Sequence, residues 1–287
     1  MVNWEAEVRG LEPFQLPNED DRSASLLTFS TWGEGERITA GFTTRHAGNA
    51  ALHVGDDPEK VIRHRSAIAS ALNWKFEAFT CAEQIHGNDV HVVTAEDVGR
   101  GRDNRENAIP DTDALVTAES DVLLAMFFAD CVPLYFHDPV TGALGLAHAG
   151  WKGTVAEIAV RTVEKMTEAF GSDPANVRAA IGPAIGSCCY EVDESVLRHI
   201  RPLLASLGLP EGATEANPIV QPNAIGERAQ LDLKHLNRQL MIKAGIMPSR
   251  IEISSWCTSC RADLFFSHRK EKGNTGRMMS WLGKKSR

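Results

Sequence analysis

The sequence has no long apolar run and few cysteines, and each shortage excludes a class of protein. Its longest uninterrupted apolar run, Val122 to Ala129, is far shorter than the roughly 20 residues of a membrane-spanning helix. Glu5, Glu7 and Arg9 lie where a secretory signal would have its apolar region. Six cysteines in 287 residues are too few for a disulfide-stapled secreted scaffold. We therefore expect a cytoplasmic protein with reduced thiols and no membrane attachment.

Positive charge is also scarce. The chain has 30 Lys and Arg against 38 Asp and Glu, a net charge of −8. A nucleic-acid-binding surface needs a clustered positive field to contact phosphates, so we expect no nucleic-acid partner, while a local basic pocket remains open. Hydrophobic content of 43% and charged content of 24% are close to the averages of folded domains. No linker or repeat divides the chain, which predicts a single domain over 1–287 with 1–30 as an N-terminal embellishment.

The order of strand-like and helix-like patterns predicts an α+β fold. Alternating or continuous apolar segments predict strands at 38–44, 79–93 with a turn at Gly87-Asn88, 113–116, 122–128, 132–136, 143–148, 177–181 and 251–254. Apolar positions repeated every three to four residues predict helices at 58–72, at 154–170, after Asp193, and from near Asp232 to Gly245. Several strands follow one another directly, which favours layered mixed β-sheets covered by helices over a doubly wound parallel sheet.

The first predicted helix carries a charged residue on its apolar face. Arg65 shares this face with Val61 and Ile68. Such an arginine either extends its charge past the edge of the apolar surface or enters a polar cavity to hold a phosphate or carboxylate group. Arg45, which follows the first predicted strand, is a second candidate for anion binding. Arg269 is a third, and is more easily explained as a surface residue.

A strand-to-helix junction at 147–154 offers another anion site. His148 ends an apolar strand, and Gly150 and Gly153 flank Lys152 just before a strongly periodic helix. Free backbone N–H groups and the positive end of the helix dipole favour phosphate there, and Lys152 adds a full charge. The alternative is a tight turn in which the glycines serve packing only.

Three potential metal ligands lie at predicted strand ends. A lone buried cysteine such as Cys131 is usually a small apolar side chain, and lone histidines such as His86 and His148 are usually satisfied polar residues. Together, two imidazoles and one thiolate would form a metal site if the strand ends converge. Three protein ligands leave a fourth position open, where catalytic zinc activates water. Spacing along the chain does not establish that the ends converge.

The remaining cysteine pairs predict structural roles. Cys257 and Cys260 have C-x-x-C spacing, but no second C-x-x-C and no histidine pair is present to complete a zinc ribbon. The surrounding pattern also lacks the βαβ context of a thioredoxin-like redox motif. Cys188 and Cys189 are adjacent and are expected to pack in a loop.

Five separated motifs, in the same order, resemble those of the YfiH/YlmD-like laccase-domain family. The motifs are Gln84-Ile85-His86-Gly87, Ala129-Asp130-Cys131-Val132-Pro133, His148-Ala149-Gly150-Trp151-Lys152-Gly153-Thr154, Gly182-Pro183-Ala184-Ile185-Gly186 with Cys189-Tyr190-Glu191-Val192, and Phe265-Phe266-Ser267 followed by Thr275-Gly276-Arg277. The resemblance extends from about Gly41 to Arg277.

The resemblance implies a fold similar to the catalytic domain of cytotoxic necrotizing factor toxins, with catalytic zinc ligands at His86, Cys131 and His148. It implies a purine nucleoside phosphorylase acting on adenosine, inosine, guanosine and methylthioadenosine, with adenosine deaminase activity. An older label for the family is copper polyphenol oxidase. Arg65 matches an arginine that family members place near the metal. The segment from His46 to Gly55 is shorter than the usual family loop, so that loop's substrate contacts are an open question.

The resemblance also suggests roles for the charged residues. In phosphorolysis, Arg45, Arg65 and Lys152 would hold phosphate against C1′ of the ribose. In deamination, zinc-activated water would attack C6 of the purine, and enzymes of the cytidine-deaminase type add a glutamate that moves the proton. No glutamate is evidently placed for this step, because period-two geometry puts Glu83 on the face opposite Gln84 and His86.

Three other functions remain open from the sequence. The same ligands, with copper in place of zinc, would suit a polyphenol oxidase, although none of the ten histidines forms the H-x-H pairs of a multicopper laccase. A metal-independent cysteine hydrolase would use Cys131 as nucleophile and His148 as base. A non-enzymatic alternative is a zinc-stabilised module that binds purines or a protein partner.

Overall fold

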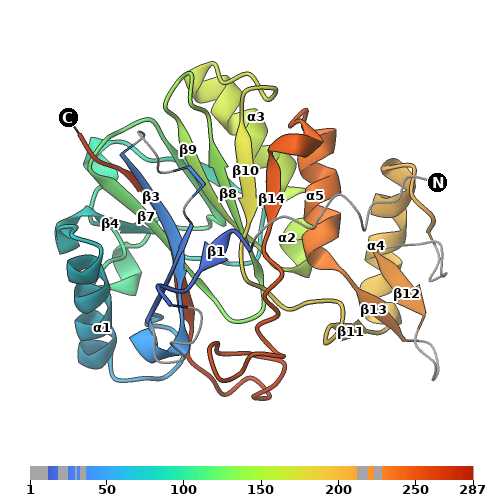
Figure 1. Ribbon diagram of the computed structural model, residues 1–287, viewed down its shortest axis with the longest axis horizontal. Helices are drawn as coiled ribbons and strands as arrows, with labels where there is room; N and C mark the ends of the chain where they lie inside the picture. Colours follow the sequence, from blue (N-terminus) through green and yellow to red (C-terminus); the bar gives the residue numbers. More distant parts are fainter. Residues whose placement is uncertain are drawn as a thin grey trace.

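The computed structural model describes residues 12–18, 25–29, 31–32, 37–211, 219–222 and 228–286. Two six-stranded sheets pack face to face in its centre, with helices on their outer sides (Figure 1). The first sheet has the order β1 (Phe14–Gln15), β2 (Leu26–Phe29), β3 (Ile38–Thr43), β15 (Met278–Lys284), β7 (Val122–Phe128), β4 (Phe79–Cys81). The second has the order β14 (Ile251–Ile253), β10 (Arg178–Ile181), β8 (Val132–His137), β9 (Leu144–Ala149), β6 (Ala114–Thr117), β5 (Val90–Val92).

The helices and a small third sheet complete the described structure. The helices are α1 (Pro58–Ala71), α2 (Trp151–Val155), α3 (Ile158–Phe170), α4 (Glu194–Ser206) and α5 (Leu233–Lys243). The third sheet has the order β11 (Glu191–Val192), β13 (Ala229–Leu231), β12 (Val220–Pro222). Both large sheets are mixed, because β4 runs parallel to β7, and β14 parallel to β10, while most other pairs are antiparallel. The predicted α+β class with layered mixed sheets is confirmed.

Strand β7 shows why the layers form. Its residues are all buried, since one face packs on the second sheet and the other on α1. Leu124 and Met126 belong to the cluster between the sheets, whereas Leu123 and Ala125 belong to the cluster beneath α1. A strand covered on both sides reads as a continuous apolar run, as observed in the sequence. On the far side of the second sheet, α3 and α5 pack against β9 and β10 (Figure 1).

Two predicted elements were wrong in extent. The strand predicted over 79–93 is interrupted after β4, because Gln84 and His86 have positive φ angles of 61° and 64°, outside the β region. The helix predicted from Thr154 begins earlier and divides into α2 and α3 at Glu157, which has a left-handed φ of 60°. The other predicted strands and helices occur within a few residues of their predicted bounds.

Both ends of the chain contribute to the first sheet, which the sequence analysis did not foresee. Strand β15 lies between β3 and β7, and Trp281 within it is completely buried. Of the segment 1–30, residues 12–18 and 25–29 are described, and they add β1 and β2 to the sheet edge with Phe14 and Leu27 fully buried. Among the described residues, every helix is too short or too polar to cross a bilayer.

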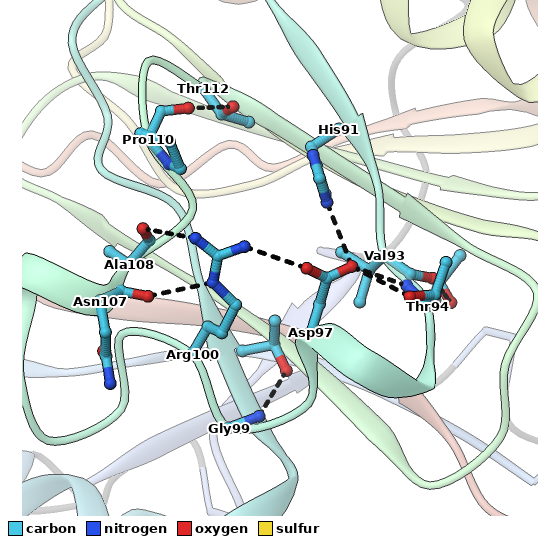
Figure 2. A network of polar contacts seen from close by, with 12 residues as sticks. His91, Val93, Thr94, Asp97, Gly99, Arg100, Asn107, Ala108, Pro110 and Thr112 are labelled. Atoms are coloured by element: carbon cyan, nitrogen blue, oxygen red, sulfur yellow. Dashed lines mark hydrogen bonds and ion pairs between the residues drawn. The ribbon is translucent and has the colours of Figure 1, made fainter.

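A polar network fixes the long connection between β5 and β6 (Figure 2). The Asp97 carboxylate accepts hydrogen bonds from Arg100 Nη1 at 3.1 Å and the Thr94 backbone N–H at 3.0 Å, and it contacts His91 Nε2 at 3.1 Å. Arg100 also donates to the carbonyls of Asn107 and Ala108. The connection therefore has a defined shape, and it leads into β6 beside the candidate site.

Candidate metal and substrate site

The three predicted metal ligands converge. His86 comes from the irregular segment after β4, Cys131 from the turn between β7 and β8, and His148 from β9. Their potential ligand atoms all lie within 4.8 Å of one another. Cys131 Sγ is 3.9 Å from His86 Nε2, and the two imidazole rings meet edge to face with centroids 4.8 Å apart. Strands of both sheets thus end at one point, which the sequence could suggest but not establish.

The Asp113 carboxylate orients two of the ligands. It is fully buried, and its Oδ1 lies 2.8 Å from Nδ1 of His148. The same carboxylate accepts hydrogen bonds from three consecutive backbone N–H groups, those of Ile85, His86 and Gly87, at 2.7–3.1 Å. An imidazole that donates from Nδ1 to a carboxylate presents Nε2 to a metal, which is the usual outer-shell arrangement of histidine ligands. No pattern in the sequence pointed to this role of Asp113.

Charge within the ligand set favours the ionised thiol. Burial opposes ionisation of Cys131, but the charge of His148 and hydrogen bonds from both histidines outweigh it and lower the thiol pKa to about 6. For His148, burial favours the neutral ring, but Cys131 and Asp113 raise its pKa to about 9. Without a bound ion, the pair is therefore a thiolate and an imidazolium near neutral pH. A thiolate is the form that binds metals.

Gly150 makes room at the ligands. A Cβ atom at this position would lie 3.0 Å from His86 Cδ2 and 3.1 Å from Cys131 Sγ. Glycine therefore allows the backbone before α2 to approach the site closely. The donor set of two imidazoles and one thiolate, with His148 already oriented, suits Zn²⁺ and resembles the ligands of catalytic zinc sites that keep an open position.

The three ligands line a cavity of about 470 Å³. This volume lies within the range of small-molecule sites. One part of its wall is apolar or aromatic and another part is cationic. The apolar and aromatic residues include Ile85, Phe127, Trp151, Ile185, Tyr190 and Leu233, and the basic residues are His53, Lys152, His268, Arg269 and Arg277. The cavity thus offers flat apolar surface and positive charge beside the ligand set.

The three residues predicted to bind phosphate lie in different parts of the structure. Lys152 lines the cavity, as its place beside His148 suggested. Arg45 forms an ion pair with Glu271 at 3.1 Å and lines a different surface depression. Arg65 is 2% exposed; its guanidinium donates to the carbonyls of Ala50, Gly101 and Arg102 at 2.6–2.7 Å. It also lies over the Phe127 ring at 4.2 Å and lines a small adjacent cavity.

Two cavity residues were missed by the sequence analysis. His53 comes from the short 46–55 segment, which therefore reaches the cavity. The residue is exposed, but desolvation by surrounding protein atoms and the charge of Arg277 lower its pKa to about 4, so it is neutral at pH 7. Arg277 belongs to the last family-like motif. No local pattern marks His53, and the motif alone did not place Arg277 in the cavity, because both positions depend on how β3 and β15 pair.

Asp130 holds another part of the cavity wall. It has a positive φ of 83° and precedes Cys131. Its carboxylate accepts hydrogen bonds from Thr258 Oγ1 at 2.6 Å, Ser267 Oγ at 3.0 Å and the Arg269 backbone N–H at 2.7 Å. The side chain of Arg269 lies over the Tyr190 ring at 5.1 Å. The segment after β14 is thereby fixed against the ligand-bearing turn.

Comparison with known proteins gives consistent results. Residues 39–285 match the family described as multi-copper polyphenol oxidoreductase laccase. Purine nucleoside phosphorylase YlmD of Bacillus subtilis is 39% identical, over 95% of this chain and 98% of its own length. The Geobacillus stearothermophilus protein of the same name is 42% identical, over 86% and 90%. The crystal structure of the Bacillus licheniformis hypothetical protein YfiH aligns with a TM-score of 0.86 and 41% identity, over 96% of this chain and all of that one.

Proposed function

The chain belongs to this laccase-domain family, and we propose that it is a zinc-dependent purine nucleoside phosphorylase. The observation that carries the proposal is the convergence of His86, Cys131 and His148 on a cavity that also holds cationic side chains. Relatives named purine nucleoside phosphorylase, matched over nearly the whole chain, support it. The proposed substrates are adenosine, inosine, guanosine and methylthioadenosine, with phosphate as the second substrate.

The cavity wall suits a nucleoside and an anion together. The base would lie against the apolar and aromatic side, where Tyr190 offers a flat ring and Ile185 an apolar contact. Lys152 and Arg277 would hold phosphate on the cationic side. In phosphorolysis, a phosphate oxygen forms a bond to C1′ of the ribose while the bond from C1′ to the purine N9 breaks. Fixed positive charge beside the phosphate would stabilise its approach to an electron-poor carbon.

Bound zinc would supply Lewis acidity and lower the pKa of a coordinated water. His86, Cys131 and His148 would hold it, and Asp113 would keep His148 in the ligating tautomer. For the proposed adenosine deaminase activity, water adds at C6 and ammonia leaves, so a proton must be moved. His53 borders the cavity and carries ring nitrogens that can accept and return a proton, and we assign it this proton transfer.

A substrate screen tests the proposal. Purified protein is incubated with inosine or adenosine and phosphate, and the products are identified by mass spectrometry. We expect free base and ribose 1-phosphate from both nucleosides, and inosine from adenosine. The Cys131→Ala variant should give almost none of these products. Equal turnover by the two proteins would reject the site assignment, and absence of all these products with wild type would reject the function.

Two observations bear on the alternative functions. The family description favours a copper oxidase, but the other group of potential metal ligands found among the described residues consists of cysteines alone. It therefore cannot supply the histidine-rich cluster of a multicopper laccase. The thiolate of Cys131 beside His148 favours a metal-independent cysteine hydrolase. Turnover that persists after verified zinc removal, and is abolished by alkylation of Cys131, would support that second candidate.

A further inference from the structure

A second group of potential metal ligands lies outside the cavity. The four-cysteine cluster consists of Cys188, Cys189, Cys257 and Cys260, whose sulfur atoms all lie within 4.8 Å of one another. The first two cysteines follow β10 and the other two follow β14. These strands are parallel neighbours, so both chain segments leave the sheet at the same edge. A bridge between Ala184 and Cys257 continues the pairing into the cluster.

The sulfur spacing matches a tetrahedral site for a single ion. Cys260 Sγ is 3.5 Å from Cys188 Sγ and 3.4 Å from Cys189 Sγ. Four thiolates around one zinc ion, each at about 2.3 Å, would be about 3.8 Å apart. A disulfide requires only two sulfurs, at about 2.0 Å. Because Cys260 contacts both adjacent cysteines, a single disulfide would leave one close neighbour unused, whereas an ion would use all four.

The backbone of the loop before Cys188 lies close to the sulfur atoms of the cluster. The Gly186 N–H donates to Cys257 Sγ at 3.2 Å. A Cβ atom on Gly186 would lie 3.2 Å from Cys188 Sγ and 3.4 Å from Cys257 Cβ, so glycine allows the loop to approach the thiols this closely. Hydrogen bonds from backbone N–H groups to sulfur are typical of metal-thiolate centres.

A buried positive charge lies on the inner side of the cluster. Lys234 is 6% exposed, and its ammonium group donates to the backbone carbonyls of Ser254 at 2.7 Å and Trp256 at 3.3 Å. Burial lowers the pKa of Lys234, and nearby negative charges, the cluster sulfurs among them, act in the opposite direction. A divalent ion with four thiolates carries two net negative charges, and a buried ammonium group would partly balance them. The carboxylates of Asp232 and Glu12 also act on this ammonium group, so the thiolates would add to a compensation that is already present.

We propose that the four-cysteine cluster binds a second, structural zinc ion. Cys188 and Cys260 are exposed, so the ion can enter from solvent, while Cys257 is buried and anchors the inner side. The ion would join the segments after β10 and β14. It would thereby support one cavity wall, because Tyr190 follows the cluster directly and Thr258 donates to Asp130. The site is separate from the proposed catalytic ligands and does not depend on the reaction.

Metal stoichiometry tests this proposal. Protein produced in zinc-supplemented medium is gel-filtered, and zinc per chain is measured by plasma mass spectrometry. We expect two zinc ions in wild type and in the control variant Cys81→Ala. Cys81 is a buried cysteine that belongs to neither group of potential metal ligands. The double variant Cys257→Ser/Cys260→Ser should retain one, as should His86→Ala/His148→Ala. One zinc ion in wild type, unchanged in the cysteine variant and lost in the histidine variant, would overturn the proposal.

Two further measurements keep the proposal testable if the cysteine variant does not fold. X-ray absorption at the zinc edge of the His86→Ala/His148→Ala protein should show an all-sulfur shell at about 2.3 Å. A shell dominated by nitrogen or oxygen would overturn the proposal. Intact wild-type protein, denatured without reductant, should have the mass of the fully reduced chain. A mass lower by two hydrogen atoms, mapped to a disulfide between cluster cysteines, would also overturn it.

Discussion

Replacement of Asp113 by asparagine is expected to weaken metal binding and stability together. In wild type, Oδ1 accepts from His148 Nδ1 and the His86 N–H, and Oδ2 accepts from the N–H groups of Ile85 and Gly87. An amide must place its NH₂ group on one of these sides. On the Oδ2 side, it would face two backbone donors. On the Oδ1 side, it would face one donor and favour the His148 tautomer that carries hydrogen on Nε2.

The magnitude follows from these contacts. A fully buried donor left without an acceptor costs about 1–3 kcal/mol. These backbone donors are partly buried, so two of them cost an amount at the lower end, about 2 kcal/mol of unfolding free energy. Loss of an orienting partner typically reduces metal affinity by about 10–100-fold. Zinc affinity is measured by chromogenic chelator competition, and stability by urea unfolding of the metal-free protein. Asp111→Asn, at an exposed position two residues away, is the matched control and should change neither quantity.

The pH dependence provides a second check on the same residue. Burial disfavours the charged form of Asp113, but the hydrogen bond and charge of His148 and the backbone N–H groups hold the carboxyl pKa below its usual value. A lowered native pKa stabilises the fold above the unfolded pKa of about 3.9, and this contribution is lost as pH falls further. The acid loss of stability should therefore be shallower in Asp113→Asn. Unchanged zinc affinity and unchanged unfolding would refute the reasoning.

Three other predictions concern single side chains. In metal-free protein, the rate at which iodoacetamide alkylates Cys131 should rise with pH through a midpoint at about pH 6, as measured by peptide mass spectrometry. Added zinc should protect Cys131 from alkylation. A midpoint near pH 9 would contradict the thiolate assignment. Lys152→Met should raise KM for phosphate at least several-fold, with a smaller effect on KM for inosine. The control variant Lys60→Met, at an exposed position, should leave KM for phosphate unchanged. The same KM for phosphate in wild type and Lys152→Met would exclude a role of Lys152 in phosphate binding. Arg65→Met should lower the free energy of unfolding in urea by about 2–5 kcal/mol, because the substitution leaves buried carbonyl groups unpaired. A variant of unchanged stability with impaired phosphate binding would instead indicate that Arg65 binds phosphate directly.

Local sequence patterns predicted most of the regular elements. The run at 122–128 and the stripe of α3 depend on side chains close in sequence, so periodicity is sufficient to find them. The segment around His86 was missed because non-glycine residues adopt positive φ there, held by Asp113. Strand β15 was missed because its sequence lacks alternation, since both of its faces are buried. Met278 and Leu282 pack in the cluster between the sheets, and Trp281 packs in the cluster beneath α1.

The sites depend on pairing between distant strands. His86 and Cys131 were recognisable as candidates, but their meeting with His148 requires the sheet arrangement. The same is true of the four-cysteine cluster: the sequence showed one C-x-x-C pair without a partner. The partner is the adjacent pair Cys188 and Cys189, brought to it by the parallel neighbours β10 and β14. For Arg65, the sequence revealed the unusual position of the residue on an apolar helix face. It could not reveal the contacts of its guanidinium group, because the partner carbonyls are distant in sequence.

Metal replacement provides the most direct test of the central claim. The protein is stripped with a chelator, loss of metal is verified, and phosphorolysis of inosine is measured before and after addition of zinc or copper. We predict that stripping abolishes formation of hypoxanthine and ribose 1-phosphate, that zinc restores it in wild type, and that zinc fails to restore it in Cys131→Ala. Full turnover by the verified metal-free protein would contradict the account.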